Sequence, residues 1–264
     1  KVPTGIAGFD DVTGGGLPRG RTTLLGGGPG SGKTIFALQY LLHGIQHCDE
    51  PGIFVAFEET AARIVANVES FGWRFDQIPD DKLFFLEAQP SPDLIQSGNF
   101  DFSGLLAILG ARTRQMGARR IVLDALDIML ALLPDEVAKR REVYRLHEWL
   151  VANEITAVIT TKAGMLDANS ESQQPFGFMQ FMVDCSVILN HSVTLGVSQR
   201  NLRVQKYRGS AFDENEAPFV IGRGGFDVVS SRSITRVEER ASHERVTTGV
   251  ERMETSAGGR AVRK

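Results

Sequence analysis

The eight residues from Gly27 to Thr34, GGPGSGKT, constrain this chain most strongly, because they fit the pattern G-x-x-x-x-G-K-[ST] without a mismatch. A β-rich run ends just before them at Leu25, and a run with helical apolar spacing follows. In this order of strand, glycine loop and helix start, backbone N–H groups and the helix dipole bind phosphate. The pattern predicts a nucleoside triphosphate site formed by Gly28, Pro29, Gly30, Ser31, Gly32, Lys33, Thr34 and Ile35.

Composition narrows the class of protein. Of the 264 residues, 42% are hydrophobic and 23% are charged, which is typical of a globular domain. The net charge of −3 gives no overall attraction for nucleic acid or an anionic membrane. No apolar run is long enough to cross a bilayer, and two distant cysteines, Cys48 and Cys185, suit a reducing compartment. We therefore expect a cytoplasmic protein without membrane contact.

Apolar strand-like runs alternate with amphipathic helical runs along the first two thirds of the chain, which predicts an α/β fold with a mostly parallel, twisted sheet and helices on both faces. Later strand-like runs are short and closely spaced, which predicts an antiparallel extension. Thr60 and Ser103 are expected to cap helices, and Gly72 and Gly117 to end them. The expected parallel strands are 52–57, 83–86, 120–124 and 156–161, and the late strands are 187–189, 203–207, 219–221 and 226–228.

The end of the chain repeats its beginning. Residues 245–264 align with residues 1–20 without a gap, with identities at Val246/Val2, Thr248/Thr4, Gly249/Gly5, Gly258/Gly14, Gly259/Gly15 and Arg263/Arg19. This offset indicates a tandem repeat rather than two unrelated glycine-rich segments. We expect residues 1–229 to form one domain, residues 230–244 a charged linker, and residues 245–264 the truncated start of a second domain.

Acidic residues at two strand ends are candidates for the chemistry of ATP hydrolysis. Asp124 ends an apolar strand in the Walker B pattern and would hold Mg²⁺ with Thr34. Glu58 and Glu59 follow another strand and are candidates for the base that orients the attacking water, with Glu58 also a candidate metal ligand. Adjacent strand residues point to opposite faces, so one is expected to be the base and the other its support. The residues leave open which is which.

Lys206 and Arg208 are two positions apart on a late strand, so they share one face and could form a cationic clamp. An exposed polar strand face is the competing interpretation. Thr160 and Thr161 end the strand after Asp124 and could sense the γ-phosphate, although threonine is also a common strand residue.

Together these motifs resemble the RecA-like ATPases, specifically the KaiC-like family of circadian clock proteins, over nearly the whole chain. The resemblance implies a slow MgATPase domain in a hexameric ring, with ATP between subunits and a possible protein partner of the clock type. It also implies that Glu58 and Glu59 are catalytic, that Lys206 and Arg208 reach the neighbour's γ-phosphate, and that a second domain in the parent protein could be a serine/threonine autokinase. Further residues expected near the nucleotide are Ser70, Phe71, Gly72, Trp73, Arg200 and Tyr207.

The alternative is a DNA recombinase of the RecA/RadA type or a helicase, which shares the fold but holds nucleic acid in the ring lumen. The expected lumen segment, 162–184, contains Lys162 against Asp167, Glu171 and Asp184, a net charge of 1 − 3 = −2. Such a segment would repel phosphates, so we expect no nucleic-acid partner. A third interpretation, a nucleotide-gated scaffold that hydrolyses ATP as a slow timer, is compatible with the family resemblance.

Overall fold

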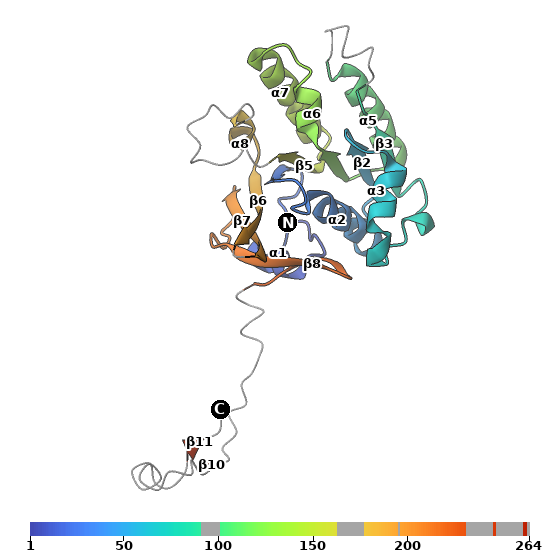
Figure 1. The fold of residues 1–264 in the computed structure, drawn as a ribbon. Coiled ribbons are helices and arrows are strands. Elements are labelled where there is room, and N and C mark those ends of the chain that lie inside the picture. Colours follow the sequence, from blue (N-terminus) through green and yellow to red (C-terminus); the bar gives the residue numbers. More distant parts are fainter. Residues whose placement is uncertain (91–100, 163–176, 195, 231–244, 247–260, 263–264) are drawn as a thin grey trace. The chain divides into compact units, whose positions relative to one another are not determined.

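A nine-stranded sheet in the order β3-β2-β4-β5-β1-β6-β7-β8-β9 organises the chain in the computed structural model (Figure 1). The structure describes residues 1–90, 101–162, 177–194, 196–230, 245–246 and 261–262. The strands are β1 (Thr22–Gly27), β2 (Gly52–Ala56), β3 (Leu83–Glu87), β4 (Arg120–Asp124), β5 (Thr156–Lys162), β6 (Cys185–Thr194), β7 (Val197–Tyr207), β8 (Ala217–Gly222) and β9 (Gly225–Val228).

The sheet changes from parallel to antiparallel at β6. Strands β3, β2, β4, β5, β1 and β6 pair in parallel, and β7, β8 and β9 follow as antiparallel neighbours. The predicted α/β class with antiparallel late strands is confirmed. The expectation of short late strands is wrong for β6 and β7, which have 10 and 11 residues. Residues 190–193 of β6 and 197–199 of β7, on either side of the turn between these strands, are exposed and mostly polar, so they gave no continuous apolar signal.

Helices cover both faces of the sheet, as the alternation predicted. On one face, α1 (Ala7–Val12), α2 (Lys33–His47) and α3 (Ala61–Val68) pack on a core that includes Val122. On the other, α5 (Ser103–Met116), α6 (Leu126–Leu130), α7 (Glu136–Ala152) and α8 (Phe178–Met182) pack on a core that includes Ile121 and Leu123. Neighbouring residues of β4 thus contribute to opposite cores, as a strand buried on both faces requires.

Most of the predicted helix boundaries agree with the structure. The Thr60 side chain accepts a hydrogen bond from the Arg63 backbone and caps α3. The 3₁₀ helices η1 (Glu69–Phe71) and η2 (Phe75–Gln77) follow, and Gly72 ends η1 with φ of 73°. Ser103 is not the cap of α5, because it is the first helical residue. Instead, the carboxylate of Asp101 accepts hydrogen bonds from both the backbone N–H and the hydroxyl group of Ser103.

The chain divides into two compact units, Lys1–Ser230 and Ser231–Lys264. In the second unit, the described residues form two antiparallel strands, β10 (Arg245–Val246) and β11 (Ala261–Val262). The predicted linker at 230–244 lies outside the described residues except for Ser230. Among the helices that the structure describes, none is both long and apolar enough to cross a bilayer.

Candidate nucleotide-binding site

The glycine loop lies between the end of β1 and the start of α2, where the sequence placed it. Gly32 precedes α2 with φ of 99°, a conformation that favours glycine. The ammonium group of Lys33 folds back onto its own loop and donates hydrogen bonds to the carbonyls of Gly27 at 2.8 Å and Gly28 at 3.0 Å. Burial lowers the pKa of Lys33, although the nearby carboxylates of Asp124, Asp127 and Glu58 oppose this shift. The loop therefore orders a cation at the place predicted for phosphate.

Open space beside the loop fits a phosphate group. A Cβ atom added at Gly28 or Gly30 would have no heavy atom within 4 Å beyond its chain neighbours. Gly27 and Gly32 differ, since a Cβ atom there would collide with Ser31 at 2.3 Å and with Ile221 at 2.6 Å. The backbone is therefore tightly packed at both ends of the loop and accessible in the middle, as a phosphate cradle requires.

Asp124 joins the loop to the end of β4. Its Oδ2 accepts a hydrogen bond from the Thr34 hydroxyl at 3.0 Å, and its Oδ1 accepts one from the Thr160 hydroxyl at 2.6 Å. Thr160 in turn accepts a hydrogen bond from the backbone of Ala125, which has φ of 62°. Burial raises the pKa of Asp124, and the two hydroxyl groups and Lys33 oppose the shift. A hydroxyl and a carboxylate held this close suit Mg²⁺, which uses few protein ligands and keeps several waters.

A cavity of about 340 Å³ collects most of the predicted site. Its walls come from the glycine loop, the segment after β2, α3, the end of β4 and the late strands. The lining residues are Gly30, Gly32, Lys33, Thr34, Ile35, Glu58, Glu59, Ile64, Asn67, Val68, Asp124, Arg200 and Ile221. Nine of these were predicted from the sequence as site residues, including Arg200, which is distant along the chain.

Glu58 and Glu59 have different surroundings. Strand β2 ends at Ala56, so both glutamates lie in the bend after the strand and strand alternation does not orient them. The Glu59 carboxylate accepts a hydrogen bond from Asn67 at 3.1 Å and lies 3.8 Å from Arg63, so α3 holds it. Glu58 is exposed at the cavity, and no hydrogen bond to its carboxylate is found within the described residues. Among the described residues, the pair therefore divides into Glu59, which α3 holds, and Glu58, whose carboxylate has no hydrogen-bond partner.

Lys206 and Arg208 lie outside this cavity and beside α8. The Lys206 ammonium donates a hydrogen bond to the carbonyl of Gln180 at 2.7 Å, and the Arg208 guanidinium donates one to the carbonyl of Phe181 at 3.1 Å. Phe181 itself is 78% exposed. Within one chain, the structure therefore does not bring the predicted clamp to the glycine loop.

The segment Ser70–Trp73 and Tyr207 also lie outside the cavity. Trp73 packs against Phe71, with ring centroids 5.1 Å apart, and lines a separate hollow beside α2. Ser70 is exposed. The Tyr207 hydroxyl is buried and donates a hydrogen bond to the carbonyl of Gly16 at 2.9 Å, so this side chain anchors the N-terminal segment.

Several residues near the loop were missed by the sequence analysis as site residues. Asn67 and Val68 line the cavity from α3, but their spacing indicated only a helix. Asp127 on α6 and Lys162 at the end of β5 both act electrostatically on Lys33. The short helix α6 was itself not predicted, because it has only five residues.

A mostly parallel sheet with a phosphate loop before α2 and a half-buried carboxylate at the end of β4 defines a RecA-like P-loop ATPase domain. Comparison with known proteins supports this class of protein. The family model described as "ATPase: KaiC" matches residues 2–233. The chain belongs to the KaiC ATPase family.

Individual relatives match along the whole chain. Circadian clock protein KaiC2 of Synechocystis sp. is 37% identical over 264 residues, which is 98% of this chain and 45% of that protein. Circadian clock oscillator protein KaiC of Prochlorococcus marinus subsp. pastoris is 39% identical over 261 residues, covering 98% of this chain and 50% of that protein. The corresponding protein of Parasynechococcus marenigrum is 38% identical over the same shares. The chain spans about half the length of the curated relatives it matches.

Proposed function

We propose that this domain binds MgATP in the cavity beside the glycine loop and hydrolyses it slowly, as a nucleotide-driven timer or signalling scaffold. The observation that carries this proposal is the convergence of Lys33, Thr34, Asp124 and Glu58 on one cavity. Three strand or helix ends supply these groups, so the fold orients them before any ligand binds. Such preorganised charge is the main way in which proteins accelerate phosphoryl transfer.

Each side chain has a separate task in the proposed reaction. Lys33 releases the carbonyls of Gly27 and Gly28 and binds the β- and γ-phosphate oxygens. Thr34 and Asp124 would hold Mg²⁺, which would neutralise the negative charge that develops on the phosphate groups. Glu58 accepts the proton of the attacking water, because its carboxylate faces the cavity with no hydrogen-bond partner among the described residues. Glu59, held by Asn67, supports the orientation of this segment.

We infer that the active site is completed between subunits of a hexameric ring. Lys206 is half-buried and Arg208 is exposed, and both lie next to Phe181 and away from their own cavity. A neighbour in a ring could receive both cations at its γ-phosphate. The parent protein would then contain two such domains, with residues 1–229 as the first, residues 230–244 as a linker and residues 245–264 starting the second, which could be a serine/threonine autokinase. A protein partner of the clock type would read the nucleotide state.

Equilibrium binding of a fluorescent ATP analogue tests the proposal. The Lys33→Ala variant should lose binding, whereas Lys82→Ala, which removes a half-buried lysine paired with Asp49, should bind as the wild type does. Size measurement by light scattering should show a ring with a non-hydrolysable analogue and smaller species without it. Binding that survives in Lys33→Ala would reject this cavity as the nucleotide site.

A further inference from the structure

A second lysine lies beside the glycine loop. In the sheet register Lys162, the last residue of β5, pairs directly with Gly27, whose carbonyl accepts a hydrogen bond from Lys33. Lys162 acts electrostatically on Lys33 and lowers its pKa, so the two ammonium groups are close enough to repel each other. The Lys162 side chain is 55% exposed and therefore has room to move.

The orientation of Lys162 follows from strand alternation. Residues two apart on a strand project from the same face of the sheet. Thr160 is two residues before Lys162, and its hydroxyl bonds to Asp124 at 2.6 Å. Lys162 therefore leaves the strand on the face that carries the Thr34 and Asp124 pair.

The partner of Lys162 holds it only weakly. Lys162 Nζ lies 4.0 Å from Oδ2 of Asp127, at the outer limit of an ion pair. Asp127 is 5% exposed, and its other oxygen, Oδ1, is buried with no hydrogen-bond partner within the described part of the chain. Burial raises the pKa of Asp127, with Lys162 and Lys33 opposing the shift. This carboxylate is thus incompletely satisfied, and the ammonium group is free to exchange partners.

The charges around the loop indicate which new partner Lys162 would take when it leaves Asp127. Asp124, Asp127 and Glu58 provide three carboxylates near Lys33, and Lys33 and Lys162 provide two cations, a net charge of 2 − 3 = −1. MgATP is an anion, and its terminal phosphate brings charge that the diphosphate lacks. A mobile cation beside the loop therefore gains most when a third phosphate is present.

We propose that Lys162 is a specificity-determining residue that contacts the γ-phosphate, and that Asp127 holds it when no γ-phosphate is bound. Lys162 then distinguishes the triphosphate from the diphosphate. This inference rests on the proposed nucleotide site. It goes beyond that site because it names a cation and a holding carboxylate that the reaction scheme does not use.

The test compares affinities for a non-hydrolysable ATP analogue and for ADP, each with Mg²⁺, by isothermal titration calorimetry. Lys162→Met should weaken triphosphate binding by about tenfold, as expected for loss of one charged hydrogen bond, and change ADP binding less than about twofold. Lys162→Arg should retain the triphosphate preference. Lys82→Met, which removes a half-buried lysine from another aspartate pair, is the matched control and should change neither affinity.

A separate variant tests whether Asp127 holds Lys162 when no γ-phosphate is bound. Asp127→Asn keeps the size of the side chain and removes the charge, so it should increase the preference for triphosphate several-fold. Equal changes for both nucleotides in Lys162→Met, or no change, would overturn the contact with the γ-phosphate. An unchanged or reduced preference in Asp127→Asn would overturn the holding role. Failure of the wild type to bind either nucleotide would instead reject the proposed function, and this inference with it.

Discussion

The hydroxyl group of Thr34 donates a hydrogen bond to Oδ2 of Asp124 at 3.0 Å, although the two residues are 90 positions apart in sequence. One lies in the first turn of α2 and the other ends β4. Thr160 holds the second oxygen of Asp124 from β5. The two groups predicted to hold the cation are therefore fixed relative to each other by three elements of the fold.

Replacing Thr34 by Val should separate metal binding from phosphate binding. The change keeps the shape of the side chain and removes the hydroxyl group. Without Mg²⁺, affinity for ATP should stay within about twofold of the wild type, because Lys33 and the loop backbone remain. The tightening produced by Mg²⁺ should fall by about tenfold or more, since the ion loses one of its few protein ligands.

The matched control for this change is Thr113→Val on α5. The Thr113 hydroxyl is buried, and it has no hydrogen-bond partner among the described residues. The Thr113→Val change should leave the affinity for ATP unchanged both with and without Mg²⁺. Equal loss of binding with and without Mg²⁺ in Thr34→Val would show that Thr34 serves the loop structure rather than the metal.

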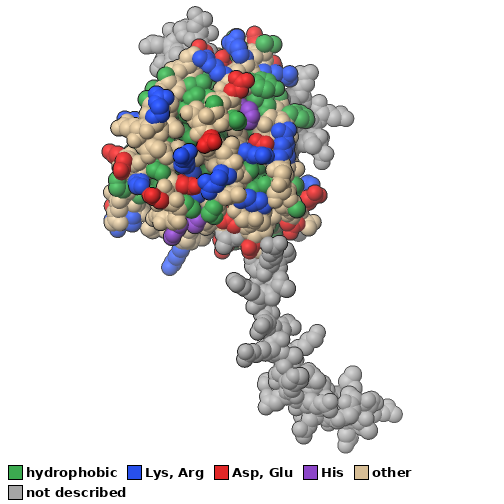
Figure 2. All heavy atoms as spheres, turned by 180° about the vertical axis from the view of Figure 1, so that it is seen from behind, with side chains coloured by type: hydrophobic (Ala, Val, Ile, Leu, Met, Phe, Trp, Pro, Cys, Tyr) green, Lys and Arg blue, Asp and Glu red, His purple; other side chains and the backbone are tan. Residues whose placement is uncertain are grey.

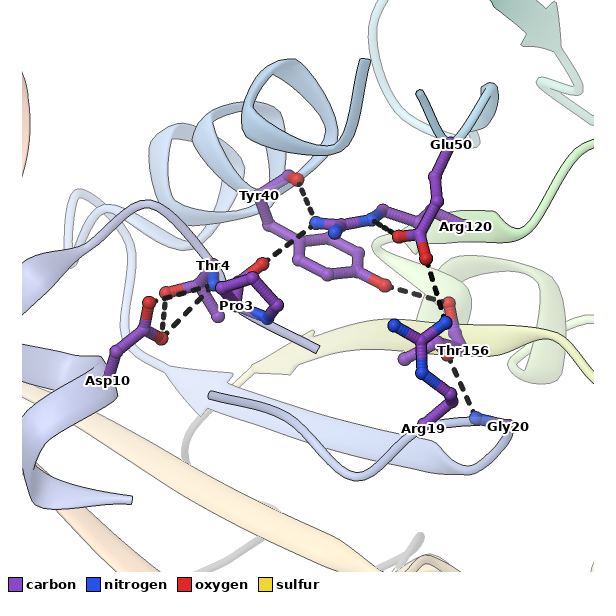
Figure 3. A network of polar contacts seen from close by, with 9 residues as sticks. All are labelled: Pro3, Thr4, Asp10, Arg19, Gly20, Tyr40, Glu50, Arg120 and Thr156. Carbon is purple, nitrogen blue, oxygen red and sulfur yellow. Dashed lines mark hydrogen bonds and ion pairs between the residues drawn. The ribbon is translucent and has the colours of Figure 1, made fainter. Parts of the chain in front are cut away.

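A buried arginine, Arg120, connects several segments at the end of the sheet opposite the glycine loop (Figure 3). The Arg120 side chain is fully buried at the start of β4, with Nε 2.7 Å from a carboxylate oxygen of Glu50. Its Nη1 donates hydrogen bonds to the carbonyls of Pro3 at 3.0 Å and Tyr40 at 2.8 Å. Glu50 also pairs with Arg19 at 2.8 Å. This network joins the N-terminal segment to the helix that carries the glycine loop.

The Glu50→Gln variant should unfold more easily, and the difference should depend on pH. Burial raises the pKa of Glu50, but hydrogen bonds from Arg19 and Arg120 outweigh this and hold it below its ordinary value of 4.5. The contribution of Glu50 to stability is therefore fully present above about pH 4.5 and lost as the pH falls through the lower, folded-state pKa. At neutral pH, breaking this buried pair should cost about 3 kcal/mol.

Urea denaturation of both proteins at several pH values measures this difference. Glu154→Gln is the control, because Glu154 is 83% exposed and lies 3.9 Å from Arg119 at the same end of the sheet. It should change the free energy of unfolding by less than about 1 kcal/mol. A loss in Glu50→Gln that persists unchanged in acid would contradict the role of the Glu50 charge.

The parallel half of the fold was predictable because its strands are buried on both faces and read as continuous apolar runs. The glycine loop and Asp124 were predictable because their chemistry needs fixed residue types at fixed places. The long β6–β7 hairpin was not, because its exposed ends resemble loop sequence. Lys162 and Asp127 were also missed as a pair, since no local pattern shows that the end of β5 and the short helix α6 meet beside the loop.

Hydrolysis should require groups from two chains if Lys206 and Arg208 act in trans. Take a variant with Lys206→Ala and Arg208→Ala and with Lys33 intact. By itself, its turnover rate for ATP should be lower than that of the wild type by a factor on the order of 10³. Mixing it with Lys33→Ala should restore part of the activity, because some interfaces combine an intact loop with an intact clamp. Phosphate release by the mixture measures this recovery.

Two results would contradict the assignment in trans. Subunit exchange without recovery of activity would show that both cations act elsewhere. An isolated monomer that hydrolyses ATP as fast as the ring would show that no second chain is needed.

Nucleic acid should neither bind tightly nor stimulate hydrolysis. The net charge is −3. On the face shown in Figure 2, Lys and Arg side chains are interspersed with Asp and Glu rather than gathered in one patch. Fluorescence anisotropy with labelled single- and double-stranded DNA, at several salt concentrations, tests this expectation. A salt-sensitive affinity of about 10⁻⁸ M or tighter would instead favour a recombinase of the RecA/RadA type or a helicase.

The most direct test of hydrolysis in this cavity is phosphate release at saturating MgATP by variants of the two glutamates. The Glu58→Gln/Glu59→Gln double variant should bind MgATP within about twofold of the wild type and lose about 10²-fold or more in turnover, because general base catalysis is removed. Glu58→Gln alone should account for most of that loss, and Glu59→Gln for less, since Asn67 and Arg63 hold Glu59 towards α3. Unchanged phosphate release in the double variant would contradict the account.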